Sequence, residues 1–231
     1  MKKLVLFSVL AAAAAAGAFA LPEFKAGAGA GGFFTSDSGG GVEVSAGGQT
    51  MSMKTPYAGG GGFAFVDLTY AELSLGVFGG GGTTKLSVGS ISLGAGMSVT
   101  GLDIGLLLKY PFAIGEKLSL FPLVGSTCRV MLSAQDTDGN KVRHITINDH
   151  AGKEADPGDF SALWFNFGGG LDVLFTDHVF LRGEALYGLR TVNKYEKDFD
   201  KVISDIAIPG VDTKALPGHG FLVKLAVGYR F

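Results

Sequence analysis

Apolar and polar side chains alternate with a period of two along most of the chain after position 21. The clearest example runs from Phe160 to Phe175, where odd positions from 163 onward are mostly large and apolar, and even positions include Asn166 and Asp172. Successive side chains of a β-strand point to opposite faces, so this pattern predicts a strand. The next alternating segment, Val179 to Arg190, begins after only Thr176-Asp177-His178, which predicts a tight hairpin.

Six further segments show the same alternation, and their connections alternate in length. The segments are Phe24 to Phe34, Tyr57 to Val66, Tyr70 to Phe78, Thr100 to Tyr110, Leu118 to Leu132 and Gly220 to Phe231. Tight turns lie near Asp67, Gly115 and Asp177, long polar segments span Thr35 to Pro56, Ser133 to Asp159 and Thr191 to His219, and a glycine-rich connection spans Gly79 to Ser92. The pattern predicts an all-β fold, namely an eight-stranded antiparallel up-and-down barrel.

The distribution of charge between the two faces of each strand distinguishes a membrane barrel from a soluble one. One face combines glycine, alanine and serine with single ionisable residues, and the other face carries almost no charge. A lipid bilayer stabilises such an uncharged face on the outside of a barrel, whereas water does not. We therefore expect a transmembrane β-barrel with long extracellular loops. Sixteen strands of about 11 residues would use nearly the whole chain, which excludes a wide porin.

Aromatic residues are expected to form belts at the two membrane interfaces. Those near the short turns are Phe24, Phe65, Tyr70, Tyr110, Phe112, Phe175, Tyr229 and Phe231. Those near the long loops are Phe33, Tyr57, Phe160, Trp164, Tyr187 and Phe221.

Composition narrows the class of protein further. Glycine supplies 38 of 231 residues, more than twice its usual share of about 7 per cent, which disfavours an ordinary helical enzyme. Beyond the first 20 residues, no apolar stretch reaches the roughly 18 residues of a membrane-spanning helix. The chain has 19 basic and 21 acidic side chains, so nucleic acid is not an expected partner.

The first 20 residues have the pattern of a signal peptide. Lys2 and Lys3 precede an apolar run, and Ala18 and Ala20 supply the small residues that signal peptidase reads. We expect cleavage after Ala20, which leaves residues 21–231 as one barrel domain. Cys128 is the single cysteine of the chain, so no internal disulfide can form.

The chain resembles small bacterial outer-membrane β-barrels of the OmpW, OmpX and OmpA-transmembrane-domain kind. The resemblance is a pattern along residues 21–231, and its one motif is the final strand, in which Val227, Tyr229 and the terminal Phe231 alternate. In the resembling barrels this ending is the signal that the outer-membrane insertion machinery recognises. The resemblance implies a place in the lipid bilayer of the cell outer membrane. Both termini are expected in the periplasm, because an even number of strands returns the chain to its starting side and the short turns belong there.

Ionisable residues on the glycine-rich face are projected into the lumen. We expect an ion-pair network of Glu72, Asp103, Arg129, Asp172, Arg182, Glu184, Arg190 and Lys224. With Lys25, Lys109 and Arg230 the projected lumen has seven cations and four carboxylates. This excess of positive charge would suit an anion-favouring passage, but an eight-stranded barrel is narrow enough for paired side chains to fill it, and we favour the filled lumen.

Other candidate chemistry is weak. Asp136 to Asn140 begins like a calcium loop, but Lys141 stands where a glycine is needed, so an Asp-Gly turn is expected. His144 and His150 are expected to be solvated, and no metal or cofactor is expected. Glu184 with a histidine and a serine could form the site of a barrel lipase or acyltransferase. His178 is expected in a short turn and His219 several strands away, so we expect no enzyme.

The sequence leaves two classes of function open. One is a narrow OmpW-like conduit for small or hydrophobic solutes, or an envelope structural protein. The alternative is a surface-exposed adhesin or interaction module that binds host surface ligands through its long loops. Within the last loop, Phe199, Val202, Ile203 and Ile206 recur at helical spacing, which predicts a short amphipathic helix.

Overall fold

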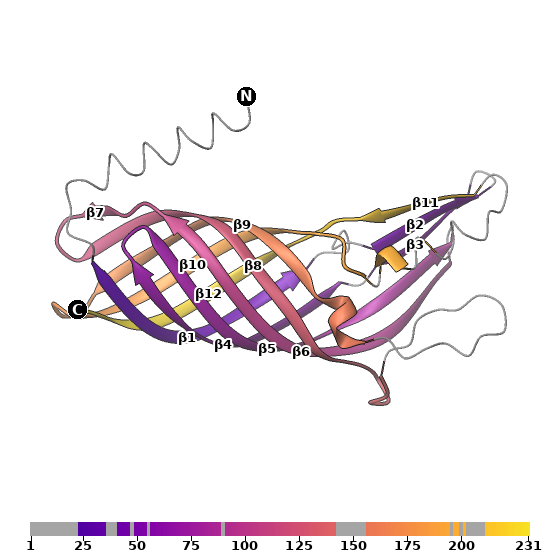
Figure 1. Cartoon of the computed structure of the whole chain (residues 1–231), viewed down its shortest axis with the longest axis horizontal. Coiled ribbons are helices and arrows are strands. Elements are labelled where there is room, and N and C mark those ends of the chain that lie inside the picture. Colours follow the sequence, from indigo (N-terminus) through magenta and orange to yellow (C-terminus); the bar gives the residue numbers. More distant parts are fainter. Residues whose placement is uncertain are drawn as a thin grey trace, which may run out of the picture.

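The computed structural model describes residues 23–35, 41–46, 49–54, 56–88, 91–141, 156–194, 196–198, 201 and 211–231. Eight of its strands close into an antiparallel barrel (Figure 1). In order around the barrel they are β1 (Phe24–Thr35), β4 (Tyr57–Leu68), β5 (Ala71–Val88), β6 (Ile91–Lys109), β8 (Leu118–Asp136), β9 (Ala162–Leu174), β10 (Val179–Arg190) and β12 (Gly218–Arg230). The predicted fold class is therefore confirmed. Within the described residues, no helix is long and apolar enough to cross a membrane.

The first and last strands form the seam that closes the barrel. β1 pairs with β12 from Lys25 opposite Arg230 to Thr35 opposite Gly220, and with β4 on its other side. The backbone N–H of Phe231 donates to the carbonyl of Phe24 over 3.0 Å, and the rings of these two residues lie 5.1 Å apart. The first predicted strand, Phe24 to Phe34, is thus paired with a neighbouring strand along both edges.

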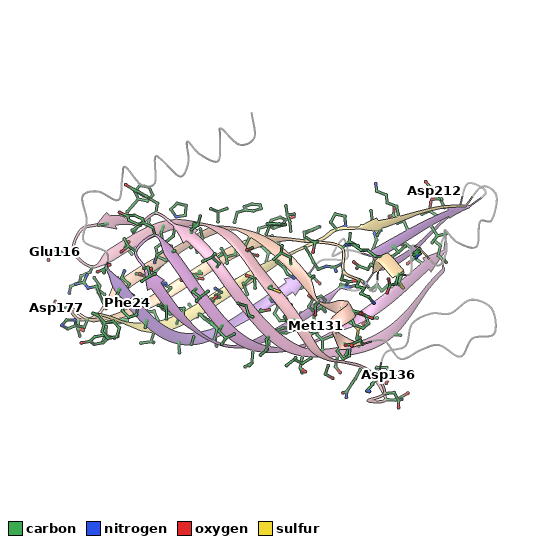
Figure 2. The ribbon with its side chains drawn as sticks, viewed as in Figure 1. Phe24, Glu116, Met131, Asp136, Asp177 and Asp212 are labelled. Carbon is green, nitrogen blue, oxygen red and sulfur yellow. The ribbon has the colours of Figure 1, made fainter. Side chains whose placement is uncertain are left out.

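The short turns and the long connections lie at opposite ends of the barrel. Phe24, Glu116 and Asp177 lie at one end and Asp136 and Asp212 at the other (Figure 2). At the short-turn end β6 and β8 are joined through the three-residue strand β7 (Phe112–Ile114), which pairs with β8.

The strand that was predicted to end at Val66 continues for two more residues. β4 continues through Leu68, and the chain turns at Thr69, whose φ of 61° lies in the left-handed region. The Thr69 hydroxyl accepts from the backbone N–H of Glu23 over 2.6 Å and donates to its carbonyl over 3.0 Å. These bonds hold a turn that is costly for a β-branched residue. Asp67 remains in the strand, so its side chain points into the lumen.

The glycine-rich connection is strand from Gly79 to Val88 and again from Ile91 onward, so its interpretation as a loop is wrong. β5 and β6 pair from Ala71 opposite Leu108 to Val88 opposite Ile91. They form a hairpin that extends well beyond the rest of the barrel (Figure 1). A run of glycines can continue a strand here because both neighbouring strands supply backbone partners along it.

Two of the predicted long loops also contain strands. β2 (Gly41–Ala46) and β3 (Gln49–Lys54) form a hairpin, β3 pairs with the outer part of β5, and β11 (Val211–Leu216) pairs with β2. Together with the outer parts of β5 and β6, these strands form a sheet beyond the barrel (Figure 1). We expect this end to lie outside the cell and call the sheet the extracellular sheet. The helix expected at Phe199 to Ile206 lies largely outside the described residues.

The outer surface of the barrel carries the apolar half of the alternation. Exposed side chains include Leu73, Leu75, Val77, Ile104, Leu106, Val124, Phe165, Phe167, Val223, Leu225 and Val227. Cys128 lies on this face as well and is exposed.

Large aromatic rings inside the barrel lie against glycines of neighbouring strands. A Cβ atom on Gly27 would lie 2.7 Å from a ring carbon of Phe65, and one on Gly101 would lie 2.7 Å from the ring of Phe78. Contacts this short leave no room for a side chain. The wall is rich in glycine partly because the rings inside occupy the space that side chains would need.

Both aromatic belts differ from the prediction. In the short-turn belt Phe65 is buried in the lumen, while the remaining members are exposed or half-buried. In the long-loop belt Phe33, Tyr57 and Trp164 also point inward, and they pack with Phe78. The prediction used only the height of each residue along its strand and not the face to which its parity assigns it.

We expect the short turns to lie in the periplasm and the extracellular sheet outside the cell. In a Cys128→Ser background, Asp212→Cys should react on whole cells with a membrane-impermeant maleimide, and Glu116→Cys should react only after lysis. Glu116 is preferable to the neighbouring Gly115, whose φ of 68° makes substitution costly. The reverse labelling pattern would show that the barrel is inserted the other way.

We expect Phe231→Ala to lower the amount of heat-modifiable protein in the membrane several-fold, since Phe231 contacts Phe24 across the seam and ends the C-terminal motif. Phe175→Ala is the matched control, because Phe175 is an equally exposed aromatic at the same end but lies in a turn. Refolding into pure lipid vesicles separates the two causes. If the variant refolds normally in vesicles, it has lost recognition by the insertion machinery. If it refolds slowly there, the seam between β1 and β12 is weakened. Normal membrane levels would contradict both.

Candidate functional site

The interior of the barrel contains the densest group of ionisable side chains, and Arg182 of β10 is its centre. The Arg182 guanidinium donates to both carboxylate oxygens of Asp172 (2.7 and 2.8 Å), to Glu72 Oε2 (2.6 Å) and to Asp67 Oδ2 (2.6 Å). Its side chain is 1 % exposed. Through this one residue, strands β4, β5, β9 and β10 are joined across the lumen.

Three lysines complete the group around Arg182. Lys25 contacts Asp172 at 3.1 Å, Lys109 contacts Asp67, and Lys224 contacts Glu184 at 3.1 Å and Glu72 at 3.6 Å. We call these residues the plug: Lys25, Lys109, Arg182, Lys224, Asp67, Glu72, Asp172 and Glu184. Its four cations face four carboxylates, so the ionised plug has no net charge.

Aromatic rings enclose the centre of the plug. The Arg182 guanidinium lies 4.5 Å from the ring centroid of Phe65, 5.2 Å from that of Phe121 and 5.3 Å from that of Phe180. These distances suit cation–π attraction. The rings also remove water from the ion pairs, which strengthens the ion pairs and raises the cost of leaving one charge unmatched.

A second ion pair lies nearer the long-loop end. Arg129 of β8 donates to both carboxylate oxygens of Asp103 on β6, over 2.8 and 2.7 Å. Its guanidinium lies 4.1 Å from the centroid of Phe33, 4.6 Å from that of Phe78 and 5.5 Å from that of Trp164. Arg129 and its three aromatic neighbours form a layer across the barrel that is separate from the plug.

A third pair joins the barrel rim to the chain that follows β10. Arg190 donates to Glu196 over 2.6 and 3.2 Å, and both residues are buried. Asn193 and Glu196 exchange side chain to backbone hydrogen bonds of 2.9 and 3.1 Å, the reciprocal arrangement of a capping box. Nearby, hydrogen bonds to Asp198 and Asp159 raise the pKa of the exposed Lys194 above its ordinary value.

The predicted excess of positive charge in the lumen is wrong. Asp67, Glu196 and Glu23 were not assigned to the lumen, and they pair with Arg182, Arg190 and Arg230 respectively. The seven cations therefore face seven carboxylates. Asp67 was missed because it shares a strand face with Phe65, which was expected in the aromatic belt at the membrane interface.

The eight residues projected to form one lumen network all point inward, but they are divided among three groups. The plug contains Glu72, Asp172, Arg182, Glu184 and Lys224. Asp103 and Arg129 form the second pair, and Arg190 lies at the rim. Of the proposed assembly signal, Val227, Tyr229 and Phe231 are exposed on the outer face. Ala18 and Ala20 lie outside the described residues.

Little space remains between the plug and the Arg129 layer. A cavity of about 40 Å³ is bordered there by Ser74, Asp103, Thr127 and Lys224, and a second cavity of about 20 Å³ lies beside Arg129 and Trp164. These volumes suit one or a few water molecules and no larger solute. Asp67, Glu72 and Glu184 each have a buried carboxylate oxygen without a protein hydrogen-bond partner, so water is a suitable ligand for them.

The described residues show no grouping of metal-ligating side chains. His178 lies in an exposed turn, where its Nδ1 lies 3.0 Å from the carbonyl oxygen of Arg230. His219 was expected several strands away from Glu184, but it lies on the neighbouring strand β12, opposite Leu189. Asp136 to Asn140 form a turn in which the Asp136 carboxylate accepts from the backbone N–H groups of Asp138 and Asn140. His144 and His150 lie outside the described residues.

The chain is similar to solved structures and to one protein-family model. No curated protein sequence matches the chain. Among solved structures, the outer membrane protein OprG from Pseudomonas aeruginosa is 12% identical, with 91% of this chain and 96% of OprG aligned and a TM-score of 0.48. Neisserial surface protein A (NspA) is 9% identical, with 90% of this chain and 97% of NspA aligned and a TM-score of 0.42. The model of the outer membrane protein β-barrel domain matches residues 4–231, and the chain therefore belongs to this family of outer-membrane barrels.

Proposed function

We propose that this protein is a closed outer-membrane barrel that serves as a rigid anchor for its extracellular sheet, and that the sheet carries the interaction with other molecules. The observation that carries the proposal is the plug, in which four cations and four carboxylates fill the short-turn half of the lumen. Because paired side chains occupy the interior of the barrel, the outer surfaces and the long connections are the parts that can interact with other molecules.

Three features oppose ion flow through the lumen. Arg182 is bonded to carboxylates of three other strands, and aromatic rings enclose it. The Arg129 layer lies above it. The cavities between the two are of the size of a few water molecules. An ion would have to break several buried pairs to pass, which costs several kcal/mol for each unpaired charge.

The extracellular sheet has the properties of a presented surface. It continues the hydrogen-bonded ladder of the barrel through β5, so it is held in a fixed orientation. Val42 and Met53 are buried on one face of the β2–β3 hairpin, whereas Ser45, Asp212 and Lys214 are exposed. A sheet with its own buried residues and a mixed polar surface is a suitable scaffold for binding a protein or glycan partner.

A narrow conduit for small hydrophobic solutes is the competing function. It would require an apolar path between the two ends of the lumen. The buried apolar side chains Leu107, Phe121, Leu123 and Leu186 pack against one another in a cluster. The conduit is therefore the less supported function.

We expect Arg182→Gln to destabilise the barrel by about 3–5 kcal/mol, because Asp67, Glu72 and Asp172 would then share too few cations. Urea unfolding in lipid vesicles, followed by heat-modifiable mobility, measures the change. Lys194→Gln removes an exposed lysine and should change stability by less than about 1 kcal/mol. Equal stability of Arg182→Gln and the wild type would show that the plug is not paired as described.

We expect the purified wild-type protein to give no stable conductance steps in planar bilayers. Residual openings should become more frequent in Arg182→Gln, because the plug loses its central cation. Large and long-lived steps from the wild type would contradict the closed lumen and make a channel the leading function.

A grafting experiment tests whether binding resides in the extracellular sheet or in the barrel. Residues 41–54 and 211–216, transferred to the matching connections of an unrelated eight-stranded barrel, should carry adhesion of displaying cells to epithelial monolayers and matrix proteins. The same barrel with both grafts scrambled is the control. If this protein still supports adhesion after residues 41–54 and 211–216 are deleted from it, the assignment of binding to the sheet is wrong.

A further inference from the structure

The outer wall of the barrel contains one groove that the plug and the extracellular sheet do not explain. It has a volume of about 530 Å³ and crosses strands β8, β9, β10 and β12. Its floor consists of the small or compact residues Pro122, Gly169, Gly183 and Ala185, which lie side by side because Pro122 pairs with Gly169 and Gly169 pairs with Ala185. Its sides are the large residues Phe112, Leu120, Leu171, Val223 and Leu225.

The groove lies at the depth of the membrane hydrocarbon. Each of its four floor residues lies five to seven positions along its strand from the short turn that adjoins that strand. With a rise of about 3.3 Å per residue and a tilt near 40°, this is roughly 13–18 Å above the short-turn end, within an apolar band about 25 Å tall. At its lower end Phe112 belongs to the β7–β8 hairpin of the short-turn side, so the groove opens toward the periplasmic leaflet.

The chemistry of the groove is that of a hydrocarbon site. Apart from paired strand backbone, its surface is formed by aliphatic and aromatic side chains. The two ionisable residues along it, Glu184 and Lys224, point into the lumen and contact each other at 3.1 Å. In a bilayer an unfilled groove would forfeit contacts along all of its sides, so a flexible apolar chain is favoured to enter.

We infer that this groove binds one acyl chain of a phospholipid from the periplasmic leaflet and holds it longer than the surrounding lipids are held. A chain in the groove is contacted by the floor and by both sides, whereas a lipid elsewhere on the barrel contacts one surface only. A second copy of the protein fits less well, because a twofold interface centred here would set groove against groove and leave both unfilled.

Gly183→Leu tests the inference because it fills the groove without a clash. A Cβ atom on Gly183 would meet its nearest neighbour, in Leu225, at 3.7 Å. Gly62→Leu is the matched control, since Gly62 also faces the lipid, at a similar depth on β4, and its Cβ would likewise have its nearest neighbour at 3.7 Å. Both variants add the same side chain to the membrane-facing wall, so both should insert normally.

The measurement is native mass spectrometry of the barrel in mild detergent, titrated with palmitoyl-oleoyl phosphatidylglycerol. The wild type and Gly62→Leu should retain one lipid per barrel, and Gly183→Leu should bind it at least tenfold more weakly. Ala185→Leu, which narrows the same floor, should behave like Gly183→Leu. Three results would overturn the inference: no retained lipid in the wild type, equal loss in Gly62→Leu, or a dimer that Gly183→Leu abolishes.

Discussion

Inside a barrel of eight strands, water is scarce and charged side chains must be matched by other side chains. Arg182 meets this requirement for three carboxylates at once, and its position fixes the places of Asp67, Glu72 and Asp172 on three other strands. A shift of any of these strands by one residue would turn its carboxylate toward lipid and leave a charge unpaired. The ion pairs thus constrain strand register as well as filling the lumen.

Glycine and aromatic residues together determine how the interior volume of the barrel is filled. The interior must be filled by side chains from a wall that curves tightly, and two large residues on neighbouring strands do not fit side by side. Phe65 lies on Gly27 and Phe78 lies on Gly101, so one ring occupies the space of two positions. The unusual glycine content is therefore coupled to the phenylalanines that point into the barrel, such as Phe65 and Phe78.

The barrel itself was predictable from the sequence because period-two alternation reports directly which face a residue occupies. The same alternation also assigned Arg182, Glu72 and Asp172 to the lumen face of their strands. It failed where pairing depends on contacts distant in sequence. Gly79 to Ser92 looks like a loop until β4 and β6 are known to flank it, and Glu196 reaches Arg190 only because the chain folds back over the rim. The belts were misassigned because Phe33, Tyr57 and Trp164 were judged by height alone.

Three strands of the extracellular sheet, β5, β6 and β11, lead directly into segments that cross the membrane. β5 and β6 extend outward without a break, and β11 is followed after Pro217 by β12, which lies in the seam beside β1. A pulling force on the sheet is consequently transmitted along strands whose hydrogen bonds lie across the direction of load. Ladders loaded in this way resist by shear, with many bonds sharing the force, so this architecture suits a protein exposed to mechanical stress at the cell surface.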